Sequence, residues 1–474
     1  MTDQNKLQNL KNVLKNYGQG HILAFWDRLD PAGQGRILAQ LDQMDFAQLD
    51  CWRKEFVLNN LPFKIPDNLA PARFYSHQPG SGQQEKYKQA TQLGEKLISQ
   101  GKVAAFVVAG GQGTRLGFDG PKGSFPISPI KHNTLFQIFA ESILAAGKKY
   151  KAKCPWYIMT SPLNYQQTLD FFAAGNYFGL DKKDVFIFQQ GTLPNFSLDG
   201  KILLSDIDTI AASPDGHGGS LRAIYNSGAL ADMQKRGIEY VSYYQVDNPL
   251  INIFDPLFIG LHALDGAEMS SKGLSKTGPF EKLGNFCLAD GKVTVIEYSD
   301  LPNELAEKKN SDGSLAFELG SIAIHIISVS FIDRLNKHGF ALPLHRAVKK
   351  IPYVDNKGQR IEPKEPNGVK LESFVFDAIP LAEKSIILQT IRSEEFGPVK
   401  NATGVDSAET ARQMIIDRAA AWLESAGVKV PRKADGLPDC VIEISPCFAL
   451  TKEDVAKKRD EIPAIKPGDK IYLA

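Results

Sequence analysis

Apolar residues recur at intervals of three and four positions in the first part of the chain. The spacing is seen at Leu7, Leu10, Leu14 and Tyr17, and again at Ile37, Leu38, Leu41, Phe46 and Leu49. One face of a helix has this period. We therefore predict a helical part over residues 1–95, with a loop at the Pro- and Gly-rich residues 62–82. Its apolar faces are expected to pack into a core, with binding of a partner helix as the alternative.

From residue 101 the pattern changes to short apolar runs with little polar alternation. They lie at 103–109, 156–160, 185–189, 240–246, 293–298 and 322–329. Runs of this kind are typical of strands covered on both faces, as in a mostly parallel sheet. Helical patterns at 135–150 and 219–235 separate some of them. We predict an α/β fold with a mostly parallel or mixed sheet flanked by helices.

The pattern thins after Leu388, where Pro and Gly interrupt shorter segments. A helix is predicted at 408–426 and short strands at 441–444 and 471–473. These elements suggest a small C-terminal domain that contains strands. The predicted organisation is a helical domain at 1–95, a central α/β domain at 96–390 and the small domain at 391–474.

Composition narrows the function classes. The 474 residues include 55 Lys and Arg against 54 Asp and Glu, a net charge of +1, so neither nucleic acid nor a membrane is an expected partner. The polar start has no export signal, and the apolar runs are far shorter than the roughly 20 residues of a membrane span. Five cysteines without a Cys-x-x-Cys spacing suggest neither a disulfide framework nor a zinc site. A soluble cytoplasmic protein is expected.

A glycine-rich segment follows the first predicted strand. It reads A-G-G-Q-G-T-R-L-G at 109–117, and G-P-K-G follows at 120–123. Glycines after a strand let backbone N–H groups approach an anion. The spacing excludes the P-loop, because Lys122 precedes its glycine, and the dinucleotide motif, because Leu116 replaces the third glycine. Arg115 and Lys122 favour a polyphosphate ligand over an ordinary tight turn, the alternative for the glycines alone.

This segment resembles the eukaryotic-type UDP-sugar pyrophosphorylases, and among them most closely the UDP-N-acetylglucosamine (UDP-N-acetylhexosamine) pyrophosphorylases. Their L-x-x-G-G-x-G-T-R-L-G signature and the P-K-G after it are matched at 107–117 and 121–123, with Val107 in place of the leading Leu. Further collinear matches lie at 156–161, 188–191, 214–219, 246–248, 349–353, 367–370, 374–377, 399–402 and 442–446. The resemblance thus covers about residues 101–446.

The resemblance implies a nucleotide-diphospho-sugar transferase core of GT-A-like, Rossmann-like type. The family's reaction is attack of a sugar 1-phosphate oxygen on the α-phosphorus of UTP, with Mg²⁺ (or Mn²⁺) assisting and pyrophosphate leaving. The partners implied are UTP and a hexose 1-phosphate, with UDP-N-acetylglucosamine as the first expectation for the product. A UDP-glucose, UDP-galactose or broad UDP-sugar pyrophosphorylase is the alternative, and a catalytically silent UDP-sugar-binding protein is the alternative of another class. The resemblance allows a monomer.

Site residues follow by the same resemblance. The phosphates would be neutralised by the catalytic cations Arg115, Lys122, Lys370 and Lys400. The nucleotide would be bound by Gly110, Gly111, Gly113, Gln190, Gly216 and Gly218. Asp247, after the strand at 240–246, is the expected Mg²⁺ ligand, because Mg²⁺ prefers hard oxygens beside substrate phosphates. A turn cap is the alternative for this carboxylate.

The sugar would be bound by Asn248, Gly284 and Glu297 and walled by Phe374 and Phe376. Packing into the core is the alternative for the two aromatic residues. Two positions depart from the N-acetylhexosamine enzymes, which usually have asparagine where this chain has His217 and Ser321. Both positions lie beside the sugar in the family. A histidine at the first position is similar to the UDP-glucose and broad-specificity enzymes, so the identity of the sugar stays open.

Overall fold

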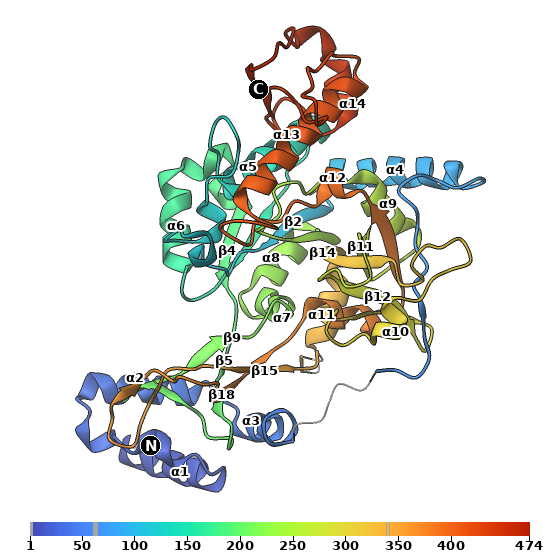
Figure 1. Cartoon of the computed structure of the whole chain (residues 1–474). Helices are drawn as coiled ribbons and strands as arrows, with labels where there is room; N and C mark the ends of the chain where they lie inside the picture. Colours follow the sequence, from blue (N-terminus) through green and yellow to red (C-terminus); the bar gives the residue numbers. More distant parts are fainter. Residues whose placement is uncertain (1–2, 60–64, 338, 341) are drawn as a thin grey trace. The chain divides into compact units, whose positions relative to one another are not determined.

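The computed structural model describes residues 3–59, 65–337, 339–340 and 342–474 (Figure 1). The chain forms two compact units. Unit 1 comprises Met1–Lys64, Gly191–Gly219 and Leu342–Val375, and unit 2 comprises Ile65–Gln190, Ser220–Ala341 and Phe376–Ala474. Each unit gathers separate stretches of the chain, so this division differs from the consecutive domains at 1–95, 96–390 and 391–474, which stay a prediction.

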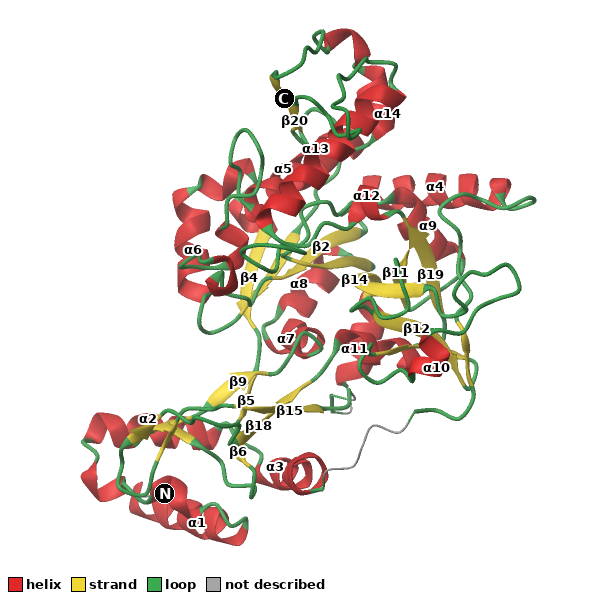
Figure 2. Cartoon of the chain, in the orientation of Figure 1, coloured by secondary structure: helices red, strands yellow, loops and turns green. Residues whose placement is uncertain are grey.

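A large mixed sheet forms the centre of unit 2, flanked by helices (Figure 2). Four of its strands are parallel neighbours in the order β10-β2-β3-β4. These strands are β2 (Val103–Val108), β3 (Trp156–Thr160), β4 (Val185–Gln189) and β10 (Tyr240–Gln245). They confirm the predicted strands, and the nearly complete burial of β2 and β3 explains their lack of polar alternation. Parallel strands place their carboxyl ends at one edge, where open α/β sheets bind ligands.

The sheet continues beyond β10 through β14 (Leu319–Ser328), which is antiparallel to it. The other strands are β1 (Leu69–Pro71), β11 (Met269–Ser275), β12 (Gly284–Ala289), β13 (Lys292–Ile296) and β19 (Ser385–Thr390). The strands predicted at 293–298 and 322–329 are confirmed as β13 and β14. The loop predicted at 62–82 is wrong in part, because β1 pairs with β12 in this segment; its residues 62–64 lie outside the described residues.

Helices cover the sheet of unit 2. They are α4 (Gln84–Ser99), α5 (Leu135–Tyr150), α6 (Tyr165–Ala174), α7 (Gly219–Asn226), α8 (Ala229–Arg236), α9 (Pro256–Leu264), α10 (Asn303–Ala306), α11 (Val329–Asn336) and α12 (Arg392–Glu395). The helix predicted at 135–150 is confirmed. The one predicted at 219–235 is two helices, because the chain turns at Gly228 with φ +83°.

Two of these helices touch backbone to backbone. A Cβ atom on Gly94 of α4 would lie 1.9 Å from the carbonyl oxygen of Pro256, and one on Gly260 of α9 would lie 1.6 Å from that of Ala90. Neither helix can carry a side chain at these positions without moving away from the other. The main core of unit 2 is rich in aromatic rings such as Phe136, Trp156 and Phe172, which pack edge to face.

The last part of the chain belongs to unit 2 and has a small core of its own. It contains α13 (Ala408–Ser425), α14 (Lys452–Lys457) and the parallel pair β20 (Val441–Ile444) and β21 (Lys470–Leu473). Leu423, Ile442 and Val455 are buried in its apolar cluster. The helix predicted at 408–426 and both predicted strands are confirmed.

Unit 1 combines helices with short strands. Its helices are α1 (Asp3–Asn16), α2 (Pro31–Asp42) and α3 (Phe46–Trp52). Its strands are β5 (Thr192–Pro194), β6 (Phe196–Ser197), β7 (Leu204–Asp206), β8 (Thr209–Ile210), β9 (Ala212–Pro214), β15 (His345–Lys349), β16 (Tyr353–Val354), β17 (Arg360–Ile361) and β18 (Gly368–Glu372). The predicted helices are confirmed, and their apolar faces do form a core. Leu14 and Ile37 share that core with Phe196 and Val369 from strands far along the chain.

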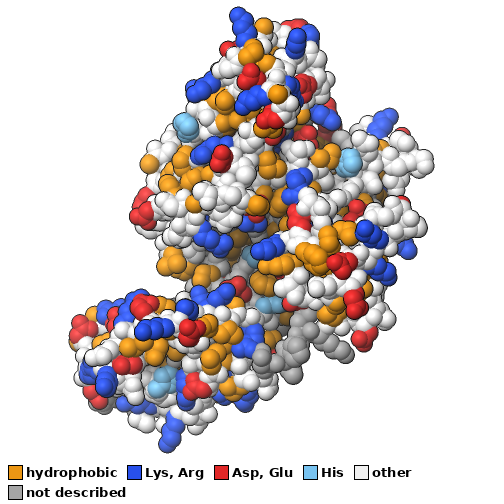
Figure 3. Space-filling model, viewed as in Figure 1, with side chains coloured by type: hydrophobic (Ala, Val, Ile, Leu, Met, Phe, Trp, Pro, Cys, Tyr) orange, Lys and Arg blue, Asp and Glu red, His pale blue; other side chains and the backbone are white. Residues whose placement is uncertain are grey.

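The surface agrees with the balanced composition. On the face shown in Figure 3, basic and acidic side chains are interspersed on both units. Among the residues that the structure describes, no helix has the combined length and apolar character needed to cross a membrane.

Candidate functional site

The glycine-rich segment folds back on itself directly after β2. The N–H of Gly113 donates to the carbonyl of Gly120 at 2.9 Å, and the N–H of Lys122 donates to the carbonyl of Gly111 at 3.0 Å. A Cβ atom on Gly113 would lie 2.7 Å from the ring of Phe118, so only glycine fits at this position. The fold of the loop brings Lys122 back beside its starting glycines.

A buried asparagine that the sequence analysis missed holds the start of this loop. Asn164 follows β3 and is completely buried. Its Nδ2 donates to the carbonyl of Ala109 at 2.9 Å and to that of Gly111 at 3.2 Å, while its Oδ1 accepts from the N–H of Ser161 at 2.9 Å. The side chain therefore ties the carboxyl ends of β2 and β3 together. An asparagine before a helix is an ordinary cap residue, so no pattern of residues indicates this contact.

Replacing Asn164 with alanine is expected to weaken binding of UTP, the expected nucleotide, by about tenfold or more, because the carbonyls of Ala109 and Gly111 each lose one donor at a cost of about 1–3 kcal/mol. Isothermal titration of UTP measures the effect. Asn310→Ala is the matched control, since Asn310 is exposed and, among the described residues, its side chain bonds only within its own loop. Equal affinity for UTP in both variants would show that the loop does not depend on Asn164.

Lys122 lies among the other charged residues predicted for the site. Its side chain is largely buried, and this burial lowers its pKa below the ordinary value. The charge of Asp247 opposes the shift, whereas those of Arg115 and Lys400 add to it. The structure thus brings four predicted residues within electrostatic range at the carboxyl edge of the sheet. Such a desolvated lysine interacts more strongly with an anion than one in water does.

The chain segment that carries Lys400 is fastened to the end of β10. The N–H of Val399 donates to the carbonyl of Asp247 at 2.8 Å. Asn248 donates from Nδ2 to the carbonyl of Glu395 at 2.6 Å and accepts at Oδ1 from the N–H of Gly397 at 3.1 Å. Asn248 therefore has a structural function that was not predicted, and its predicted contact with the sugar stays a prediction. Lys400 itself pairs with Asp406 at 3.5 Å.

The predicted nucleotide-binding residues of unit 2 gather at the same edge. Gln190 directly follows β4, and a Cβ atom on Gly110 would lie 2.4 Å from its Oε1. The close approach explains why residue 110 has no side chain. The space beside Gly111 is open: a Cβ atom added there would lie 4.0 Å from Cε of Lys122, its nearest neighbour outside the adjacent residues. Exposed backbone here can approach a ligand.

The predicted sugar-binding residues of unit 2 lie together in part. Gly284 of β12 is the register partner of Ser321 of β14. A Cβ atom on Gly284 would lie 3.5 Å from Oε1 of Glu297. Phe376 is buried in the short helix Val375–Leu381, and its predicted place at the wall of the pocket stays a prediction.

Unit 1 holds the remaining predicted residues. Glycines 216 and 218 pack on the turn after β18: the N–H of Gly218 donates to the carbonyl of Ser373 at 2.8 Å, and a Cβ atom on Gly216 would lie 2.3 Å from that oxygen. The ring of His217 stacks on that of Phe374, with a centroid distance of 5.2 Å. Lys370 is half-buried on β18, opposite Ala347 of β15.

His217 is a neutral hydrogen-bonding group. Burial, with a contribution from His345, lowers its pKa to about 4, so the ring is uncharged at neutral pH. Its Nδ1 accepts from the N–H of Val375 at 3.1 Å. In a neutral imidazole the other nitrogen then carries the proton, and Nε2 is a donor.

The donor set suits a metal held mainly by substrate. Among the described residues, no three His, Cys, Asp or Glu side chains gather as metal ligands. Mg²⁺ is commonly bound by one or two carboxylates together with phosphates and waters. The half-buried Asp247 carboxylate beside Lys122 fits that pattern.

Comparison with known proteins decides the family. Residues 75–473 match the family model described as UTP–glucose-1-phosphate uridylyltransferase. The chain belongs to the UTP–glucose-1-phosphate uridylyltransferase family. The resemblance noted from the sequence is confirmed, and the predicted enzyme class, a nucleotidyltransferase, is the class of this family.

Relatives within the family span nearly the whole chain. The UDP-N-acetylhexosamine pyrophosphorylase-like protein 1 of Xenopus tropicalis is 37% identical over 466 residues, which cover 92% of this chain and 91% of the relative. The UDP-N-acetylglucosamine pyrophosphorylase of Saccharomyces cerevisiae is 36% identical over 474 residues, which cover 96% and 98%. The family assignment therefore rests on both units of the chain.

Solved structures confirm the predicted fold class. The uridine diphosphate N-acetylglucosamine pyrophosphorylase of Trypanosoma brucei aligns with a TM-score of 0.81 at 26% identity, covering 100% of this chain and 98% of that one. A mutant UDP-glucose pyrophosphorylase of Leishmania major aligns with a TM-score of 0.62 at 17% identity, covering 94% and 91%. The second likeness concerns the fold alone.

Proposed function

We propose that this chain transfers a uridylyl group from UTP to N-acetylglucosamine 1-phosphate, forming UDP-N-acetylglucosamine and pyrophosphate. The observation that carries the proposal is the group of Arg115, Lys122, Lys400 and Asp247 at the carboxyl edge of the parallel strands. The relatives named as UDP-N-acetylglucosamine pyrophosphorylases support the choice of sugar. A reaction between two anions needs such cations to bring the partners together.

The proposed chemistry needs no covalent intermediate with the protein. The sugar phosphate oxygen forms a bond to the α-phosphorus of UTP as the bond to the pyrophosphate oxygen breaks. Lys122 stabilises the charge that spreads over the transferring group and the leaving oxygen, since fixed cations in a desolvated site stabilise developing charge without reorganising. Arg115 binds the phosphates through its planar guanidinium group. The backbone of Gly110 and Gly111, with Gln190, binds the uracil.

Asp247 is the proposed ligand of Mg²⁺, or of Mn²⁺. The ion would supply further positive charge to the phosphates when bound. The cytoplasm is the proposed location: all five cysteines are free in the described structure, and Cys51 and Cys447 are exposed, as suits a reducing compartment.

A second candidate, a UDP-glucose, UDP-galactose or broad UDP-sugar pyrophosphorylase, is favoured by two particular residues. His217 and Ser321 stand where N-acetylhexosamine enzymes usually have asparagine. An asparagine side chain both donates and accepts hydrogen bonds, whereas His217 with its Nδ1 engaged has only Nε2–H to donate. A shorter Ser321 leaves room that a water can fill.

A panel of sugar 1-phosphates with UTP and Mg²⁺ distinguishes these candidates. The expected result is pyrophosphate release that is fastest with N-acetylglucosamine 1-phosphate. A preference for glucose or galactose 1-phosphate would establish the second candidate. No turnover with any sugar, together with tight UDP-sugar binding in calorimetry, would indicate a silent binding protein.

His217→Asn is expected to raise the ratio of kcat/KM for N-acetylglucosamine 1-phosphate over glucose 1-phosphate by about tenfold, the usual worth of one well-placed polar contact. Because His217 stays neutral above its pKa of about 4, the ratio in the unmodified protein is expected to be constant between about pH 5.5 and 8. His345→Asn is the control on the same aromatic stack. An unchanged ratio would exclude His217 as the residue that discriminates between the sugars.

A further inference from the structure

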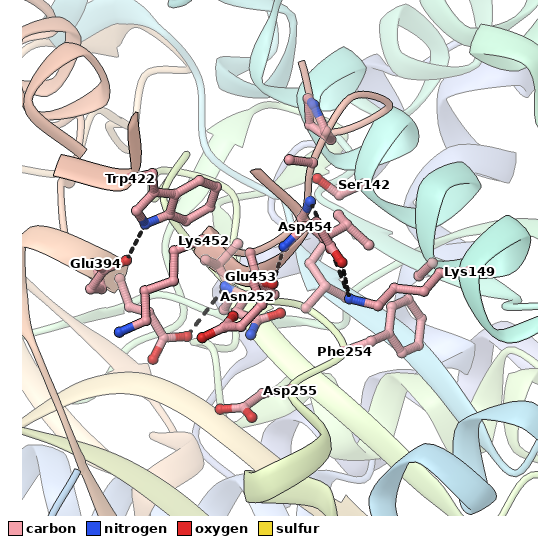
Figure 4. A pocket seen from close by; sticks show the side chains of 18 of the residues that line it. Ser142, Lys149, Asn252, Phe254, Asp255, Glu394, Trp422, Lys452, Glu453 and Asp454 are labelled. Carbon is pink, nitrogen blue, oxygen red and sulfur yellow. Dashed lines mark hydrogen bonds and ion pairs between the residues drawn. The ribbon is translucent and has the colours of Figure 1, made fainter. Parts of the chain in front are cut away.

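Unit 2 contains a cavity of about 640 Å³ that the sequence analysis did not anticipate. It is lined by parts of α5 and α13, by residues 249–257 that follow the Asp247 segment, and by residues 444–457 near the C-terminus. Figure 4 shows Trp422 and Glu394 on one side of this cavity and the ion pair of Lys149 with Asp454 on the other. Its volume lies in the range of sites for small organic ligands.

One cation in the lining has an unused hydrogen-bonding edge. Nη1 of Arg418 donates to the carbonyls of Leu250 at 2.8 Å and Glu394 at 3.0 Å. The opposite edge, formed by Nε and Nη2, has no acceptor within the described part of the chain. These two parallel N–H groups match the two oxygens of a carboxylate. Burial lowers the pKa of Arg418 to about 10 in spite of the nearby Glu394 and Glu395, so its charge is not fully compensated.

The acidic residues of the interior are already engaged. Asp255 and Glu395 both pair with Lys272, and Asp454 pairs with Lys149 at 2.7 Å. The Glu394 carboxylate accepts from Nε1 of Trp422 at 2.8 Å. The lining carboxylates without such a partner among the described residues, Glu95 and Glu453, are exposed to solvent, which screens their charge.

Apolar side chains, two of them aromatic, complete the site. The guanidinium of Arg418 lies 5.0 Å from the centroid of the Trp422 ring. Pro249, Phe254 and Ile415 also line the cavity. We propose that this cavity binds a small organic carboxylate with a flat apolar body, whose two oxygens accept from the Nε–Nη2 edge of Arg418.

Arg418 also connects the cavity to the catalytic residues. The two carbonyls that Nη1 holds belong to Leu250, three positions after Asp247, and to Glu394, six positions before Lys400. Asn248 joins the same two segments through Glu395 and Gly397. A carboxylate bound to Arg418 therefore changes the positions of Asp247 and Lys400 through the two segments that Arg418 holds. The cavity is thus an effector site in this proposal. This last step rests on the proposed function.

Binding is tested with 3-phenylpropionate and its neutral isostere 3-phenylpropionamide, by saturation-transfer NMR and calorimetry on the full chain. We expect the acid to bind with a Kd of about 1 mM, as suits a small fragment, and the amide to bind at least tenfold more weakly. Ser142→Phe fills the cavity from α5 and should abolish binding. Ser99→Phe, at the exposed end of α4, is the matched control and should bind normally. Arg418→Lys keeps the positive charge but removes the two parallel N–H groups of the guanidinium, and should weaken binding of the acid at least fivefold.

Equal affinity for the acid and the amide would contradict the proposed carboxylate site, and so would undiminished binding of 3-phenylpropionate to Ser142→Phe. Both results can be obtained even if Arg418→Lys fails to fold. For the effector step, saturating 3-phenylpropionate should change kcat/KM for UTP by about threefold in the unmodified protein and in Ser99→Phe, but not in Ser142→Phe. Binding with no change in kcat/KM would overturn the effector step. Binding without any turnover would instead contradict the proposed function and leave the cavity site established.

Discussion

Replacing Lys122 with alanine is expected to lower kcat by about two to four orders of magnitude, with a much smaller change in affinity for UTP. The side chain is largely buried and close enough to Asp247, Arg115 and Lys400 for their charges to affect its pKa. Removing one preorganised hydrogen-bond donor at a site of developing charge costs about 10²–10³ in kcat, and removing a charged group from a desolvated position should cost at least as much. Because the charge matters most as the leaving oxygen becomes negative, kcat should fall more than UTP affinity does.

Steady-state pyrophosphate release measures this effect. Lys148→Ala is the matched control, since Lys148 is an exposed residue of α5. The pH profile gives an independent check on the unmodified protein. Since burial lowers the pKa of Lys122, its charge is lost as the pH rises through a value below that of an ordinary lysine, and kcat/KM should decline there. A kcat equal to that of the control variant would remove Lys122 from the catalytic group.

Replacing Lys272 with methionine is expected to be the most destabilising of the substitutions considered. Lys272 is 1% exposed on β11 and contacts Asp255, at 2.6 Å, and the carboxylate of Glu395. Without the ammonium group, two partly buried carboxylates lose their counterion. Breaking a buried ion pair from one side costs about 3–5 kcal/mol. In a unit of this size, each kcal/mol lost from the free energy of unfolding lowers Tm by roughly 2 °C, so Tm should fall by about 6–10 °C.

Differential scanning calorimetry measures the change. Lys337→Met removes the lysine of an exposed pair with Asp333, at 2.8 Å, and should lower Tm by no more than about 2 °C. Glu395 also anchors the segment leading to Lys400 through its bond from Asn248. The Lys272 variant should therefore lose activity below its unfolding temperature. Equal Tm values for the two variants would show that the ion pairs of Lys272 with Asp255 and Glu395 contribute no more to stability than a surface pair does.

The parallel strands β2 and β3 could be predicted because each is a largely apolar run whose residues are nearly all buried, so that neither face of the strand shows a polar alternation. The strand β11 could not, since Ser270, Ser271 and Lys272 are buried there and hydrogen-bond to histidines and carboxylates from other elements. A polar run that is satisfied by distant partners has no hydrophobic signature. The shared core of Leu14 and Val369 was equally hidden, because no local pattern shows which distant segments will meet.

The candidate site divides in a similar way. Arg115, Lys122 and the glycines stand in one compact motif, so the sequence indicates them together. Asn164 and Arg418 act on backbone carbonyls, which every residue has, and so leave no trace in a pattern of side chains. Asn248 was placed at the sugar from a motif, whereas its hydrogen bonds show it fastening the segment before Lys400.

The contact of α4 with α9 limits how this fold can evolve. Gly94 and Gly260 are the points where each helix meets the main chain of the other, so a methyl group at either position would push the pair apart. A mutation at one of them cannot be compensated by trimming a neighbouring side chain, because the obstacle is a peptide carbonyl. Evolutionary drift at these two sites should therefore be slower than at the surrounding apolar positions, where one side chain can shrink as another grows.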